Sequence, residues 1–139
     1  MSIRLPIICL TLVSLFSCKT GAAEEGESFD LHAAYIQIVL FHLEQRCASC
    51  NAVEEETMRL LEGEYNEAFQ SGKIKFIPMN YQSEHGRKAA ELLRAAGQTL
   101  YVVYGDSISN LTSAAFFYAQ THPDYYHKAL RKELDKYLK

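Results

Sequence analysis

Two cysteines, Cys47 and Cys50, stand two residues apart between an apolar stretch and a helical pattern. If the pair opens a helix, this spacing brings both sulfurs onto one turn. The first cysteine then lies at the helix N-terminus, where free backbone N–H groups and the helix dipole favour its thiolate. The pattern predicts thiol–disulfide exchange, with Cys47 as the nucleophile and the more buried Cys50 as the resolving thiol.

The residues around the cysteines suggest supporting roles. Arg46 stands next to Cys47 and either stabilises its thiolate charge or is a solvated charge at the rim of the site. His42 is the nearest candidate for proton transfer, and a hydrogen-bonded structural histidine is the alternative reading. The acidic residues Glu44 and 54–56 oppose thiolate formation, so only a moderately lowered pKa is expected for Cys47.

The N-terminal residues predict export and a lipid anchor. After Arg4, residues 5–16 form an apolar run that is too short to span a bilayer but typical of a signal peptide. The sequence 15–18 (Leu-Phe-Ser-Cys) resembles the lipobox of bacterial lipoproteins, which predicts a signal peptide over 1–17 and lipidation at Cys18. Ordinary cleavage after Ala23 is the alternative. Residues 18–28 are small, polar and acidic, as in a flexible tether.

The number of cysteines and the net charge exclude some classes of function. The chain has 139 residues, four cysteines, 14 basic and 17 acidic residues, and a net charge of −3. The absence of a basic stripe argues against nucleic acid as a partner. If Cys9 leaves with the signal peptide and Cys18 is lipidated, only Cys47 and Cys50 remain. They close almost no loop and stabilise the fold little as a disulfide, so a reactive pair is the better reading.

Residues 29–139 predict one α/β domain with the element order β-α-β-α-β-β-α. Buried strands are expected at 35–42, 73–79 and 99–104, with a short fourth strand at 107–111 whose length favours a monomer. Helices are expected at 48–70, at 83–96 with Ser83 as its cap, after Thr112, and from Pro123 to the C-terminus. The first helix should expose Glu56, the second should bury Leu92 and Ala96, and His85, His122 and His127 should lie at the surface.

This order, with a dithiol after the first strand, resembles a thioredoxin-like fold: a central mixed four-stranded sheet flanked by helices, with the CxxC at the N-terminus of the first core helix. More narrowly, the chain resembles small thioredoxin-like lipoproteins of the nitrophenyl compound nitroreductase subunit (ArsF-type) family. The resemblance covers roughly residues 33–139. It is carried by Phe41-His42, by 46–54 around the dithiol, by 97–100, and by 110–112 with Ala115-Phe116.

The chain departs from ordinary thioredoxins at three places. The familiar Trp-Cys-Gly-Pro-Cys is replaced by residues 46–50, Arg-Cys-Ala-Ser-Cys. Phe41 stands where the resemblance places a buried carboxylate that assists proton transfer. Gln98-Thr99 stands where a cis-proline faces the dithiol, and a trans peptide is expected there. In thioredoxin-like proteins this loop holds the substrate chain, so Thr99 indicates a changed docking surface.

The resemblance implies a cell-envelope thiol–disulfide oxidoreductase, acting as a reductase or electron relay on a disulfide-bearing protein. Its implied electron source is a membrane thiol transporter of the DsbD/CcdA kind, and no cofactor is expected. Two alternatives remain. One is a thioredoxin-fold binding or scaffold subunit with an idle dithiol. The other is a metal-binding module, for which Cys47, Cys50 and at most His42 are available, whereas a closed zinc site takes four ligands.

Overall fold

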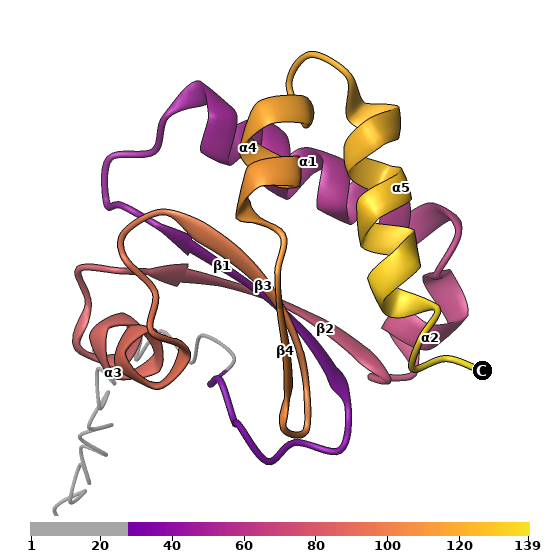
Figure 1. Cartoon of the computed structure of the whole chain (residues 1–139), viewed down its shortest axis with the longest axis horizontal. Helices are drawn as coiled ribbons and strands as arrows, with labels where there is room; N and C mark the ends of the chain where they lie inside the picture. The colour runs from indigo at the N-terminus through magenta and orange to yellow at the C-terminus, as the bar shows by residue number, and fades with distance from the viewer. Residues whose placement is uncertain (1–27) are drawn as a thin grey trace, which may run out of the picture.

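The computed structural model describes residues 28–139 and shows an α/β fold built on one four-stranded sheet (Figure 1). The strand order across the sheet is β2-β1-β3-β4. The strands are β1 (Ile36–His42), β2 (Ile74–Asn80), β3 (Thr99–Tyr104) and β4 (Ser107–Asn110). β1 pairs in parallel with β2 and antiparallel with β3, so the sheet is mixed. This arrangement is compatible with a thioredoxin-like fold and confirms the predicted α/β class.

Helices cover both faces of the sheet (Figure 1). They are α1 (Ala48–Gly63), α2 (Asn66–Gln70), α3 (Glu84–Leu93), α4 (Thr112–Tyr118) and α5 (Pro123–Leu134). Ile38 and Leu40 of β1 pack in a core with α1, α4 and α5. Val39 and Phe41, which alternate with them, pack on the other face against α3. A strand covered on both faces favours apolar residues at successive positions, which explains the apolar run over residues 38–41 of β1.

The predicted helix over 48–70 is two helices, because the chain turns between Gly63 and Asn66. Glycine and asparagine are weak helix formers, and side-chain bonds from α5 hold the turn in place. Arg131 donates two hydrogen bonds of 2.6 Å to the Glu64 carboxylate, and the Tyr65 hydroxyl donates one of 2.7 Å to Asp135. The break therefore lies where the end of α1 meets α5.

Helix α3 begins as predicted and ends earlier. The Ser83 hydroxyl accepts a hydrogen bond from the Gly86 backbone N–H at 2.9 Å, which confirms it as the cap. The helix ends at Leu93 rather than Ala96, because Arg94 adopts the left-handed conformation (φ 52°) that stops it. The predicted inward positions Leu92 and Ala96 are wrong: both side chains are exposed, and Leu92 retains 58% of its surface.

Two side chains expected at the surface are buried instead. Glu56 of α1 is 7% exposed and His127 of α5 is 9% exposed. The His127 ring lies between α1 and α5, with Nε2 3.0 Å from Glu56 Oε2 and 3.1 Å from the Glu56 carbonyl oxygen. Arg59 contacts the other carboxylate oxygen of Glu56 at 2.8 Å. Burial is tolerated because the acid and the histidine are paired with each other.

The N-terminal predictions lie outside the described residues. These are the signal peptide over 1–17, lipidation of Cys18, and the tether except for its last residue. Within residues 28–139, none of the helices has the length and apolar character needed to cross a membrane.

Candidate active site

The two cysteines occupy the start of α1, just after the carboxyl end of β1. Cys47 is the N-cap residue of α1, with extended backbone angles, and its side chain is exposed. Cys50 lies within the first turn of the helix and is fully buried. Their sulfurs are 3.3 Å apart, which is hydrogen-bond distance for two thiols. The pair therefore has one sulfur that a partner molecule reaches and one that it does not.

The two thiols differ in acidity in the order that the sequence predicted. Hydrogen bonds from the Cys50 backbone N–H and the Cys50 thiol lower the pKa of Cys47, and the Ser49 backbone N–H adds to this effect. Burial raises the pKa of Cys50, and the hydrogen bond with Cys47 raises it further. The exposed sulfur is therefore the better thiolate, and the buried sulfur holds its proton.

Gln98 contacts both sulfurs and was not singled out by the sequence. Its side-chain oxygen Oε1 lies 3.3 Å from Cys50 Sγ and 3.6 Å from Cys47 Sγ. Gln98 stands one residue before β3, directly after Gly97, whose positive φ of 85° turns the chain. The available signal was its position in the loop before the third strand, which the fold resemblance places opposite the dithiol.

Arg46 pairs with a carboxylate. Its guanidinium contacts Glu54 Oε2, one turn beyond Cys50 on α1, and both side chains are about one-third exposed. The positive charge of Arg46 also acts to lower the pKa of Cys50, against the stronger effect of burial. Arg46 thus belongs to the charged surroundings of the dithiol, and its charge is offset by that of Glu54.

His42 forms its hydrogen bond away from the sulfurs. Its Nδ1 lies 2.9 Å from the Leu43 carbonyl oxygen. A carbonyl oxygen only accepts, so this nitrogen carries the ring proton. Among residues 28–139 no hydrogen bond joins His42 to Cys47 or Cys50. This geometry fits the structural alternative for His42 better than a role in proton transfer.

Thr99 begins β3 and is nearly buried, at 8% exposure. Its backbone pairs with Phe41 at the end of β1, and its hydroxyl donates to the Gly97 carbonyl oxygen at 3.4 Å. The Gln98–Thr99 peptide is trans, as expected. Phe41 is fully buried and packs edge-on against Tyr81 and Tyr101. The position expected for a buried carboxylate is therefore apolar.

A metal site with protein ligands is poorly supported. Within residues 28–139, no three His, Cys, Asp or Glu side chains come together in a way that could hold an ion. Cys47 and Cys50 supply two sulfurs, and the neighbouring Gln98 supplies an amide oxygen, which is a poor ligand for soft metals. The geometry is better suited to chemistry between the two sulfurs.

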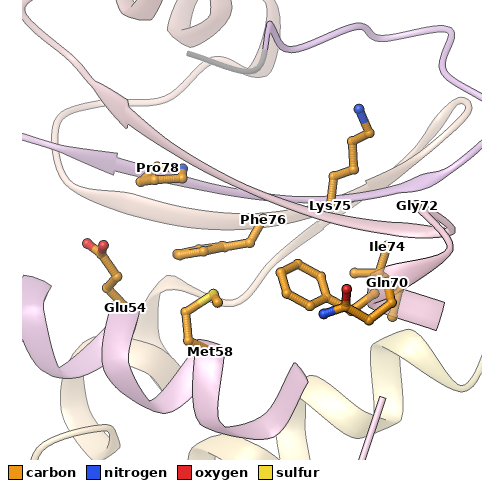
Figure 2. A pocket seen from close by; sticks show the side chains of 9 residues that line it. Glu54, Met58, Gln70, Gly72, Ile74, Lys75, Phe76 and Pro78 are labelled. Atoms are coloured by element: carbon orange, nitrogen blue, oxygen red, sulfur yellow. The ribbon is translucent and has the colours of Figure 1, made fainter. Parts of the chain in front are cut away.

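A surface groove of about 580 Å³ lies between α1, α2 and the edge strand β2. Figure 2 shows Glu54 and Met58 projecting from α1 toward Phe76 and Pro78 of β2. The dithiol and Gln98 are not among the residues that line it. Glu54, which pairs with Arg46, is the link between this groove and the surroundings of Cys47.

Neither the protein-family models nor the curated proteins include a match to this chain.

Proposed function

We propose that this chain is a thioredoxin-like thiol–disulfide oxidoreductase of the cell envelope, which uses Cys47 and Cys50 as a reductase or electron relay. The observation that carries the proposal is the asymmetry of the pair. One sulfur is exposed with a lowered pKa, and its neighbour at 3.3 Å is buried with a raised pKa. Attack and resolution by two different thiols require this division.

The reaction proceeds in two exchanges. The Cys47 thiolate attacks one sulfur of a substrate disulfide, that S–S bond breaks, and the leaving sulfur departs as a thiolate that takes a proton from water. Cys50 then loses its proton to water and attacks the Cys47 sulfur, which releases the second substrate sulfur as a thiolate that is protonated in turn. The substrate disulfide gains two electrons and two protons, and Cys47 and Cys50 become a disulfide.

The site has no electron source of its own, so the dithiol must be regenerated by a second thiol partner. Following the ArsF-type resemblance, we assign this role to a membrane thiol transporter of the DsbD/CcdA kind. A lipid on Cys18 would keep the domain beside such a partner. The substrate is then a protein disulfide exposed at the periplasm or outer surface.

The test is a redox titration of the full-length chain in mild detergent against reduced and oxidised mixtures of glutathione or dithiothreitol. Alkylation followed by peptide mass mapping reports the state of Cys47 and Cys50 separately from other cysteines. A reversible couple near roughly −270 mV supports a reductase. A value near about −120 mV would contradict the reductase assignment and indicate an oxidant. A pair that forms no disulfide at any ratio would overturn the proposal and leave the scaffold alternative.

A further inference from the structure

We propose that the side-chain amide of Gln98 sets the redox equilibrium of the dithiol by accepting a hydrogen bond from the Cys50 thiol in the reduced state. The inference rests on the proposed function, since it assumes that Cys47 and Cys50 form a reversible disulfide. It is drawn from one contact: Gln98 Oε1 lies 3.3 Å from Cys50 Sγ and 3.6 Å from Cys47 Sγ.

The hydrogen bond from the Cys50 thiol to Gln98 Oε1 can form only when the cysteines are reduced. Cys50 has one thiol proton, and two acceptors lie at the same distance of 3.3 Å: the Cys47 sulfur and Gln98 Oε1. When Cys47 Sγ bonds to Cys50 Sγ, both thiol protons have left and neither sulfur has a hydrogen to donate. The amide oxygen loses its donors on oxidation. The hydrogen bond therefore favours the dithiol over the disulfide.

The backbone holds Gln98 in this position from both sides. Gly97 turns the chain with a φ of 85°, and Thr99 pairs with Phe41 at the end of β1. The carboxyl end of β1 leads directly to the loop that carries Cys47. The sheet register thus fixes Gln98 opposite the first turn of α1, although Gln98 and Cys50 are 48 residues apart in the chain.

An amide suits this role better than an acid. It is neutral at every pH, so it accepts from a thiol without repelling the Cys47 thiolate. The neighbouring polar side chains are engaged elsewhere: Glu54 pairs with Arg46, and His42 bonds the Leu43 carbonyl. Among the described residues, Gln98 is the one side chain outside the pair that forms a hydrogen bond with either sulfur. Its replacement should therefore change the equilibrium directly.

The test compares full-length wild type with Gln98→Leu, Gln98→Glu and the control Gln120→Leu at an exposed glutamine after α4. Loss of one hydrogen bond in Gln98→Leu should shift the dithiothreitol equilibrium about 3- to 10-fold toward the disulfide, which is about 14 to 30 mV. Gln98→Glu keeps an acceptor but adds a negative charge that disfavours the Cys47 thiolate, so it should shift less far toward the disulfide than Gln98→Leu and should slow alkylation of Cys47 by iodoacetamide at neutral pH.

The outcomes separate this inference from the proposed function. If wild type forms the disulfide reversibly and Gln98→Leu stays within twofold of it, the role of Gln98 is wrong and the function stands. If Gln98→Glu shifts the equilibrium toward the disulfide as far as Gln98→Leu does, the acceptor oxygen makes no difference and the inference is overturned. If wild type forms no disulfide at any ratio, both the function and the inference fail.

Discussion

His127 Nε2 lies 3.0 Å from Glu56 Oε2, and both residues are almost completely buried between α1 and α5 although 71 positions separate them. Removing the histidine leaves a buried carboxylate that retains Arg59 alone. We expect His127→Leu to lower the free energy of unfolding by about 1 to 3 kcal/mol, because the buried Glu56 carbonyl oxygen and carboxylate lose their polar contact with the ring. Chemical denaturation measures it, with exposed His122→Leu as the matched control. Equal stability of the two variants would contradict this role.

Tyr126 gives a second stability prediction, with a dependence on pH. Thr57 donates its hydroxyl proton to the Val53 carbonyl at 2.6 Å, so the Tyr126 hydroxyl donates to Thr57 across another 2.6 Å contact. Tyr126→Phe should cost about 1 kcal/mol at neutral pH. Burial raises the pKa of Tyr126, so its contribution is complete below the unfolded value of about 10 and is lost as pH rises above it.

The alkaline part of this prediction is tested by denaturation at several pH values. The stability of wild type should fall more steeply above about pH 10 than that of Tyr126→Phe. Tyr125→Phe is the control, because Tyr125 is 63% exposed. Parallel stability curves for wild type and Tyr126→Phe would show that the buried hydroxyl does not titrate with unfolding.

The difference in acidity between the thiols predicts two separate alkylation profiles. The lowered pKa of Cys47 means that its reaction with iodoacetamide should rise at lower pH than that of an ordinary thiol. Cys50, with a raised pKa and a buried sulfur, should react more slowly at every pH near neutrality. Mass mapping of each cysteine against pH measures this. Equal rates for both, or faster reaction at Cys50, would reverse the assigned roles.

Single substitutions test the order of the two exchanges. Cys47→Ser should abolish reduction of a protein disulfide, because the exposed nucleophile is gone. Cys50→Ser should still attack but should accumulate a mixed disulfide between Cys47 and the substrate. Non-reducing electrophoresis distinguishes the two variants. Full activity of Cys47→Ser would show that another group is the nucleophile.

Arg46 and Glu54 should have opposite effects on the thiols. Their ion pair places one charge of each sign near the dithiol. Glu54→Gln leaves Arg46 unbalanced and should speed alkylation of Cys47 at neutral pH, whereas Arg46→Gln should slow it. Because both groups are partly exposed, changes of about two- to fivefold are expected. Glu62→Gln, at an exposed position of α1, is the control. Changes in the same direction would contradict an electrostatic effect.

The strands could be predicted from the sequence because buried strands contain successive apolar residues. Both faces of β1 and β3 are covered, so apolar residues are continuous over 38–41 and 100–103. The helix boundaries were less readable. The break at Gly63–Asn66 depends on the bonds of Glu64 and Tyr65 to α5, and these partners stand 67 and 70 residues away. The helix propensities of the residues around the break therefore do not predict these long-range hydrogen bonds.

The site was predicted at the cysteines and missed at their partner. The CxxC spacing and the position before a helix fix the geometry of Cys47 and Cys50 locally. Gln98 reaches the sulfurs only because β3 pairs with β1 in a particular register. The sequence around a glutamine in a loop contains no other sign of such a role. The burial of Glu56 and His127 was not predicted, because it depends on the packing of α1 against α5. On its own helix, each occupies a position typical of a surface residue.

The central place of β1 has a consequence for the order in which the protein forms. β1 is hydrogen-bonded to β2 on one side and to β3 on the other, and β3 extends to Tyr104. The sheet therefore cannot close around β1 until three-quarters of the chain has left the ribosome, and such non-local pairing folds slowly. The burial that raises the pKa of Cys50 is therefore complete only after β3 has joined the sheet.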